Sequence, residues 1–364
     1  MARVGWLAAP VLGALLAGRI AERAGAGRGE RAIAAALAAA AIVLLADGLT
    51  PWLRQFAGGL AEPVMVALVL AAVERGLAGR EGAALALGAA AALVRPEVWP
   101  ALLVYGGWLW SARPERRPAV ATAIAGIAAL WFVPDLLGSG SLFTGADRAR
   151  EGSGSPPVEA LEVIGRAAVL PLAALWLGFA GCAVAARRRG DRALLIVAAG
   201  ALAWVALVAV MAAGGYAGLP RFLAPAAAVA CALGAAGLAR LGTRARDPGA
   251  PRALVAITAV LVLALAVQAG FRVAALPGDA RSATAISAAR EQLELAVDEV
   301  GAGTISDCGE PVVGAIEGQT ALAWLLDVPI GEVDVSKTPP SRGVFFERTD
   351  GGWTARSVAC DAES

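Results

Sequence analysis

Ten apolar segments follow one another through most of this chain, and they constrain its fold more than any other feature. Most approach the roughly 20 apolar residues that an α-helix needs to cross a bilayer. The chain is 58% hydrophobic with a mean hydropathy of +0.67, whereas soluble domains are about 45–50% apolar. The sequence therefore predicts a mainly α, polytopic membrane protein with about ten transmembrane segments, at residues 4–18, 32–47, 58–74, 82–95, 97–110, 118–135, 165–186, 193–213, 222–239 and 253–271.

The loops between these segments alternate in charge. Every second loop is rich in arginine, and such loops belong in the cytoplasm. This pattern predicts an N-terminus outside the cytoplasm, and it places the chain after residue 273 outside as well. The basic loops contain Arg19, Arg23, Arg28 and Arg31, then Arg75 and Arg80, then Arg113, Arg116 and Arg117, then Arg187, Arg188, Arg189 and Arg192, and finally Arg240, Arg244, Arg246 and Arg252.

The last part of the chain is the least apolar. We expect a transmembrane domain over residues 1–273 and a small extracytoplasmic α+β domain over residues 274–364. Within the second domain the pattern predicts an amphipathic helix at 280–300, a strand at 303–309 and a helix at 318–328. Two alternating runs around residues 350–352 predict a β-hairpin, because Asp-Gly is a typical hairpin turn.

The cysteines divide by environment. Cys308 and Cys360 both fall in the predicted outer domain, where an oxidising exterior permits a disulfide between them. The alternative is two free thiols. Cys182 and Cys231 fall within apolar segments, where we expect chemically inert core residues.

Composition excludes several kinds of chemistry. The chain has no histidine, which excludes histidine-based triads and histidine-ligated zinc. Its cysteines form no Cys-x-x-Cys pair, so no metal site is predicted. No cofactor is required, although a divalent ion is compatible with the chemistry proposed below. A net charge of +1 gives no reason to expect a nucleic acid partner.

Lys337 is the only lysine among 31 basic residues, a usage typical of GC-rich bacterial genomes. We therefore expect a bacterial plasma (inner) membrane protein.

Arg95, Pro96 and Glu97 interrupt an otherwise apolar stretch. Each charge at membrane depth costs roughly 2.5–3.5 kcal/mol on insertion scales, so the segment is a candidate functional site. Proline removes a backbone donor and breaks helices. The flanking segments are therefore expected to form two half-length helices or a kinked pair.

The predicted topology gathers charged residues on the outer side. Arginine matches phosphate geometry, and carboxylates can orient sugar hydroxyls or act as a base. An outer site of this composition suits a ligand with an anionic head and an apolar tail. The charged residues expected there are Asp47, Arg54, Glu62, Arg95, Glu97, Asp147, Arg148, Arg150, Glu151 and Arg221.

Each of these residues also has a structural interpretation. Arg95 and Glu97 could form an ion pair that only holds a kink. Glu62 could pair with Arg54 or Arg95. Arg221 could be an interfacial residue that extends its charge to water, and the charges of the long loop at 137–163 could simply be solvated.

Three motifs together resemble the GT-C-type polytopic glycosyltransferases, a group that includes enzymes dependent on polyprenyl-phosphate-mannose. They are GGLAEPVMVALVLAAVERGL at 58–77, GAAAALVRPEVWPALL at 88–103 and GYAGLPRFLAPAAAVACALGAAGLARL at 215–241. The resemblance covers roughly residues 1–275. It implies that Glu62, Arg95, Glu97 and Arg221 surround a site for a polyprenyl-phosphate-linked sugar at the bilayer surface, whose sugar passes to an extracytoplasmic acceptor.

One part of the family pattern is not found. The resemblance implies an N-terminal helix followed by an outer loop with the catalytic acid, and we expect this chain to lack both. Asp47 and Asp147 are then the remaining catalytic candidates. A secondary transporter or lipid flippase, or a non-catalytic membrane scaffold, are the alternative functions.

Overall fold

The computed structural model describes residues 2–45, 61–139, 142, 156–216, 218–349 and 352–360. Its chain divides into two compact units, Met1–Asp279 and Ala280–Ser364. The division falls inside one long helix, a few residues after the boundary predicted from the sequence.

Unit 1 is helical throughout the part of the chain that the structure describes, which confirms the mainly α prediction. Two short 3₁₀ turns, η1 (Pro96–Val98) and η2 (Pro114–Arg116), separate consecutive helices. The helices are α1 (Ala2–Arg23), α2 (Arg28–Val43), α4 (Glu62–Leu77), α5 (Glu81–Val94), α6 (Trp99–Ala112), α7 (Arg117–Ser139), α9 (Pro156–Val169), α10 (Ala173–Arg189), α11 (Arg192–Ala213), α12 (Pro220–Arg244) and the first part of α13 (Arg252–Val300).

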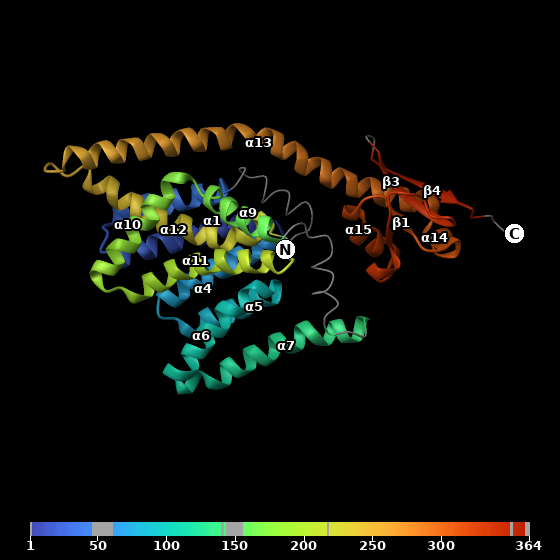
Figure 1. The fold of residues 1–364 in the computed structure, drawn as a ribbon, viewed down its shortest axis with the longest axis horizontal. Helices are drawn as coiled ribbons and strands as arrows, with labels where there is room; N and C mark the ends of the chain where they lie inside the picture. Colours follow the sequence, from blue (N-terminus) through green and yellow to red (C-terminus); the bar gives the residue numbers. More distant parts are fainter. Residues whose placement is uncertain are drawn as a thin grey trace. The chain divides into compact units, whose positions relative to one another are not determined.

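Helix α12 is the buried centre of unit 1. It packs against α1, α2, α4, α10 and α11 (Figure 1), and every side chain from Leu223 to Ala239 is buried. This segment is dominated by alanine and glycine, and small side chains allow neighbouring helix backbones to approach closely. The closest approach is to α10, where a Cβ added to Gly178 would overlap the carbonyl oxygen of Gly234.

Four described helices are long and apolar enough to cross a membrane, or up to five if one bent pair forms a single span. They lie at Pro114–Leu137, Arg192–Ala213, Pro220–Arg244 and Arg252–Val300. Each of the ten predicted segments is largely helical where the structure describes it. The membrane class is thus supported, and the number of ten crossings stays a prediction.

The break at Pro96 follows from the chemistry of proline. Helix α5 ends at Val94, and Arg95 is extended (φ −149°, ψ 132°), as expected for the residue before a proline. Pro96 cannot donate to the carbonyl of Ala92, four residues earlier. Two indole N–H groups donate to that carbonyl instead, from Trp99 (2.9 Å) and Trp131 (3.0 Å). The predicted pair of short helices is therefore observed, and tryptophans from α6 and α7 stabilise the break.

The predicted segment at 165–186 is not one continuous helix. It is divided between α9 and α10, which are bent by 85°, and the predicted loop at 137–163 is helical from residue 156. Arg272 of α13 holds this corner by donating to the carbonyl oxygens of Val169 and Leu170, each at 2.8 Å. Gln268 accepts from the amide of Ala173 at 2.8 Å. These distant partners cannot be read from the local apolar pattern.

Unit 2 combines helices with a four-stranded sheet in the order β2-β1-β3-β4. Strand β1 is parallel to β2 and β3, and β3 pairs with β4 in antiparallel fashion. The core contains Leu293, Ile305, Leu322, Val344 and Phe346. The elements after α13 are α14 (Ala302–Cys308), β1 (Val312–Val313), α15 (Ile316–Leu326), η3 (Ile330–Glu332), β2 (Asp334–Val335), β3 (Gly343–Thr349) and β4 (Gly352–Val358).

The local predictions for unit 2 were mostly correct. Helical structure at 280–300 and 318–326 and the β3–β4 hairpin are confirmed. The predicted strand at 303–309 is wrong, because α14 occupies this segment. Ile305 and Cys308 are both buried, and residues three apart share one face of a helix. Packing of that face against the core outweighs the β-propensity of Thr304 and Ile305.

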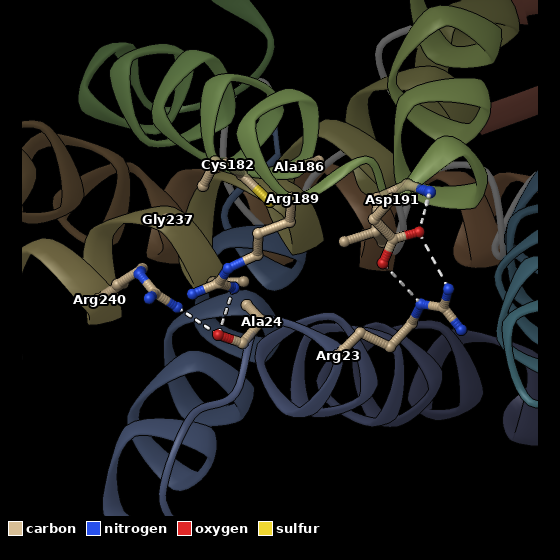
Figure 2. Close-up of a pocket in the computed structure, with 11 residues that line it drawn as sticks. Arg23, Ala24, Cys182, Ala186, Arg189, Asp191, Gly237 and Arg240 are labelled. Carbon is tan, nitrogen blue, oxygen red and sulfur yellow. Dashed lines mark hydrogen bonds and ion pairs between the residues drawn. The ribbon is translucent and has the colours of Figure 1, made fainter.

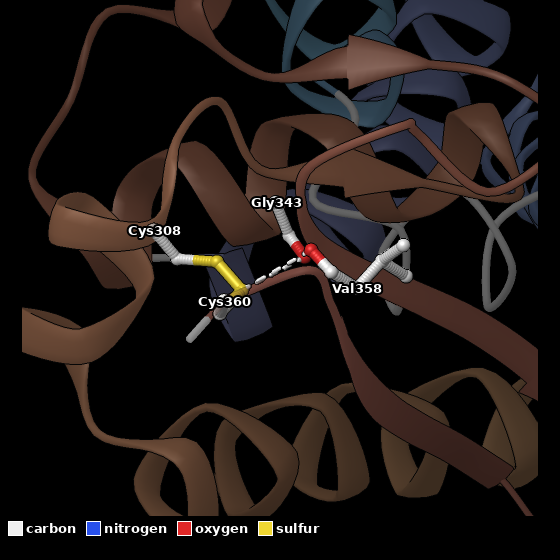
Figure 3. The surroundings of a disulfide bond; sticks show 4 residues. All are labelled: Cys308, Gly343, Val358 and Cys360. Atoms are coloured by element: carbon white, nitrogen blue, oxygen red, sulfur yellow. Dashed lines mark hydrogen bonds between the residues drawn. A yellow bond between two sulfur atoms is a disulfide. The ribbon is translucent and has the colours of Figure 1, made fainter. Parts of the chain in front are cut away.

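A disulfide joins Cys308, at the end of α14, to Cys360, just after β4 (Figure 3). The two Cα atoms are 5.2 Å apart and the cysteines are 52 positions apart in sequence. The predicted bond is therefore confirmed over the alternative of two free thiols. Cys182 and Cys231 are free and buried, as expected.

Candidate functional site

Glu62 is the centre of the candidate site. It is the first residue of α4, follows Ala61 at the N-cap and precedes Pro63. The N-terminus of a helix carries a partial positive charge that stabilises a carboxylate. The Glu62 side chain is 0% exposed, so its charge needs further partners within the protein.

Two arginines from distant parts of the sequence supply those partners. Arg95, which caps the end of α5, donates from Nη2 to Glu62 Oε1. Arg221, near the start of α12, places Nε 3.5 Å from the same oxygen. Three helix ends therefore meet at one carboxylate. We call Glu62, Arg95, Glu97 and Arg221 the Glu62 cluster.

An aromatic ring lies against both arginines. The guanidinium carbon of Arg95 and that of Arg221 are each 5.3 Å from the centroid of the Phe222 ring, within the range of a cation–π interaction. Trp204 Nε1 donates to the Phe222 carbonyl at 2.8 Å. Sequence reasoning did not single out Phe222, although its position directly after Arg221 is a usable signal.

Glu97 completes the cluster. It lies in η1, where Pro96 sets the start of the turn, and it is buried. It is close enough to interact electrostatically with Glu62, Arg95 and Arg221. The alternative Arg95–Glu97 ion pair is not found among the described residues; Arg95 pairs with Glu62 instead. The alternative interpretation in which Glu62 pairs with Arg95 is therefore observed.

The cluster contains buried polar atoms whose hydrogen-bonding capacity is unused. Among the described residues, Glu62 Oε2, Glu97 Oε2 and Arg221 Nε are buried and have no hydrogen-bond partner. Leaving such a group unpaired costs about 1–3 kcal/mol. Arg221 Nε still has the Glu62 carboxylate within 3.5 Å, whereas Glu62 Oε2 and Glu97 Oε2 have no donor in the described part of the chain. These two free oxygens make the cluster a candidate site for a polar ligand.

Exposure differs between the acids and the bases of the cluster. The Glu62 side chain is fully buried, whereas those of Arg95 and Arg221 are 25% and 31% exposed. An incoming ligand therefore meets guanidinium groups first, with the carboxylate beneath them. Paired guanidinium groups recognise phosphate and carboxylate oxygens through several parallel hydrogen bonds.

The predicted catalytic candidates, Asp47 and Asp147, lie outside the described residues. The other loop charges expected at this surface, Arg54, Arg148, Arg150 and Glu151, also lie there. Within the described ranges, no group of three or more Cys, Asp or Glu side chains is arranged to hold a metal ion.

A separate hollow lies near the C-terminal ends of α1, α10 and α12 (Figure 2). It is lined by Arg23, Arg189, Asp191 and Arg240 together with small apolar residues around Cys182. Its volume is about 20 Å³, enough for roughly one water molecule and too small for a sugar. The sequence predicts these arginines only as parts of the basic loops.

Comparisons with known protein families, with curated proteins and with solved structures give no match for this chain.

Proposed function

We propose that this protein is a membrane glycosyltransferase that moves a sugar from a polyprenyl-phosphate donor to an extracytoplasmic acceptor. One observation carries the proposal. Two partly exposed arginines, Arg95 and Arg221, are held side by side over the buried carboxylate of Glu62. That arrangement is suited to a phosphate at the end of an apolar chain, which is the chemistry of a polyprenyl-phosphate sugar.

In the proposed complex the phosphate of the donor lipid accepts hydrogen bonds from N–H groups of Arg95 and Arg221 that Glu62 does not use. Glu62 acts as a positioning residue that keeps both guanidinium groups in place. The unpaired Oε2 of Glu97 is available to accept a hydrogen bond from a sugar hydroxyl. The donor thereby supplies partners for the buried polar atoms of the cluster.

The proposed reaction is a direct displacement. The acceptor hydroxyl attacks the anomeric carbon, the bond from that carbon to the phosphate oxygen breaks, and polyprenyl phosphate leaves with its electron pair. A carboxylate takes the proton of the acceptor, and Asp47 and Asp147 are the candidates. The arginines stabilise the negative charge that develops on the departing phosphate. The product carries an inverted anomeric configuration.

The orientation of the protein supports this assignment. Arg221 and Arg240 are 19 positions apart in α12, or about 28 Å at 1.5 Å per residue, close to the thickness of a bilayer core. The basic loops lie at the Arg240 end of the helix, so we infer that this end is cytoplasmic and that the Glu62 cluster faces the outer surface. The disulfide of unit 2 fits the same outer, oxidising side.

The broken pair α9–α10 bears on the alternative of a transporter. Transporters use carbonyl groups at helix breaks to bind their ions. At this break, the carbonyls of Val169 and Leu170 already accept hydrogen bonds from Arg272. The corner is therefore explained as a structural joint, which favours the transferase over the transporter.

The first prediction tests the donor site. In purified full-length protein, polyprenyl phosphate is expected to raise the unfolding temperature, and uncharged polyprenol of the same length is not. Arg95→Ala and Arg221→Ala should each abolish this shift and lower transfer from polyprenyl-phosphate hexoses by about 100-fold, because each removes a donor that stabilises the leaving phosphate. Arg252→Ala, an exposed arginine at the start of α13, is the matched control and should behave like the wild type.

The outcomes separate the candidate functions. Retention of both the phosphate-dependent shift and the transfer rate in Arg95→Ala and Arg221→Ala would remove the basis of the proposal. Binding without any transfer by the wild type would favour the non-catalytic scaffold. Movement of the lipid across sealed proteoliposomes, without transfer of its sugar, would favour the flippase.

A further inference from the structure

The hollow shown in Figure 2 lies where three helices of unit 1 come together. Helices α1 and α10 end there at Arg23 and Arg189, and α12 contributes Arg240 near its own end. The carbonyl oxygen of Ala24 accepts hydrogen bonds from Nη1 of Arg189 and from Nη1 of Arg240, the latter at 2.5 Å. Two guanidinium groups therefore converge on one neutral oxygen.

The carboxylates nearby form their hydrogen bonds with other residues. Asp191 accepts two hydrogen bonds from Arg23, at 3.1 and 2.9 Å. Glu30 accepts a hydrogen bond from Thr243 at 3.3 Å. Among the described residues, neither Arg189 nor Arg240 forms an ion pair with a carboxylate. The two charges repel each other, so a bound anion would stabilise the arrangement.

One donor of the pair is also unused. Arg240 Nε is buried and has no hydrogen-bond partner among the described residues. The hollow beside it has a volume of about 20 Å³, which admits a single oxygen atom or a water molecule but not a whole headgroup. An anion would therefore sit at the mouth of the hollow, with one oxygen directed between the guanidinium groups.

An exposed apolar stripe of α10 runs toward the same end of the helix as the hollow. Leu177 and Val184 of α10 are exposed large apolar side chains, and Gly181 lies between them with no atom near its missing side chain. These positions are spaced by three or four residues, so they form one stripe of the helix, and exposed Arg188 continues that stripe. A lipid chain along this stripe would bring its headgroup to the end of α10.

We propose that Arg189 and Arg240 bind the phosphate group of an anionic phospholipid at the basic-loop surface of the membrane. Exposed Arg244 of α12 adds positive charge beside Arg240, and exposed Arg187 and Arg188 lie in the last turn of α10. Anionic lipids of the cytoplasmic leaflet are attracted to such clusters. This site is separate from the Glu62 cluster, which lies near the other end of α12. The proposal does not depend on the transferase function.

The second prediction tests this site in the full-length protein. Phosphatidylglycerol is expected to raise the unfolding temperature in detergent, and zwitterionic phosphatidylcholine with the same chains is not. Arg189→Gln with Arg240→Gln should weaken phosphatidylglycerol binding at least tenfold. Arg246→Gln is the matched control: this exposed arginine follows the end of α12 and donates to the carbonyl of Gly242 in the last turn of that helix, and its substitution should leave binding unchanged.

Two further experiments complete the test. One compares inorganic phosphate with the lipid, and the other cross-links a photoreactive lipid to the protein. A shift by millimolar phosphate equal to that by phosphatidylglycerol would overturn the lipid assignment in favour of a free anion. A photoreactive phosphatidylglycerol is expected to label the ends of α10 and α12 in the wild-type protein, which keeps the test valid if the double variant does not fold. Labelling elsewhere alone, or equal binding of both phospholipids, would overturn the proposal.

Discussion

At the scale of single residues, the environment of a buried charge depends on which side chains it pairs with. Glu62 is buried at a helix N-terminus and holds Arg95 and Arg221, which come from other helices. Replacing a buried ion pair by apolar groups can be neutral, whereas removing one partner is costly, because the other charge is left unpaired. The burial of this charged cluster is therefore no evidence of a gain in stability.

Asp191 allows the contribution of one ion pair to stability to be tested, because it lies in a loop before α11. It caps the N-terminus of α11 by accepting from the Leu194 amide and also pairs with Arg23. The hydrogen bonds from Arg23, more than the backbone hydrogen bond from Leu194, hold the pKa of Asp191 below its ordinary value despite partial burial. Because the folded-state pKa is depressed, the stabilisation is present above the unfolded pKa of about 3.9 and is lost as pH falls through the folded value.

The third prediction follows from the lowered pKa of Asp191. Asp191→Asn keeps the capping oxygen and removes the charge, so we expect a loss of about 0.5–1 kcal/mol in unfolding free energy at pH 7. The measurement is the unfolding free energy in detergent from pH 7 to pH 3, where the two proteins should converge at low pH. A difference that is the same at every pH would contradict the assignment to the Arg23 ion pair.

At the scale of elements, backbone proximity decides which helices form the core. Helices α10 and α12 touch at glycines, and any larger side chain there must displace a backbone. A Cβ on Gly178 would overlap the Gly234 carbonyl and lie 2.8 Å from Leu238 Cγ. By contrast, Gly181 in the same helix has no atom within 4 Å of that position.

The fourth prediction compares these two glycines. Gly178→Ala should destabilise the protein by about 1–3 kcal/mol, since overpacking forces the two helices apart. Gly181→Ala should be neutral or stabilising by up to about 1 kcal/mol, because alanine favours the helix. Unfolding midpoints of the purified proteins in detergent provide the measurement. Equal effects of the two substitutions would show that helix contact at Gly178 does not limit stability.

At the scale of the whole molecule, one helix contributes to two cores. Leu261 of α13 belongs to the core of unit 1, and Leu293 and Val297 of the same helix belong to the core of unit 2. Unit 2 is small, and small domains bury too little apolar surface to be very stable without additional links. The Cys308–Cys360 disulfide supplies such a link.

The fifth prediction concerns this disulfide. Replacing Cys308 and Cys360 together by serine should lower the stability of unit 2 by about 2–4 kcal/mol, as expected when a loop of this length is no longer closed. Hydrogen exchange of the intact protein should become faster in β3 and β4, while exchange in α12 stays unchanged. A reducing agent should reproduce the effect in the wild type and have none in the double variant. Unchanged exchange in β3 and β4 would contradict the prediction.

Sequence reasoning succeeded where the signal was local. The hairpin around residues 350–352 and the break at Pro96 follow from turn chemistry and from the missing donor of proline. It failed at 303–309, where β-propensity suggested a strand and packing of Ile305 selected a helix. It also missed the corner between α9 and α10, because Arg272, which holds the corner, lies about a hundred residues away in sequence.

The sequence by itself determined that this is a mainly helical protein with helices apolar enough to span a membrane and a small C-terminal sheet domain, and that charged residues interrupt the apolar segments. Those properties follow from hydropathy, charge and turn chemistry, which act over a few neighbouring residues. Only the tertiary structure decided that Arg95 pairs with Glu62 rather than Glu97, that Phe222 lies against both arginines, and that Arg189 and Arg240 share the carbonyl of Ala24. Such contacts join distant parts of the chain, so they exist only once the helices have packed.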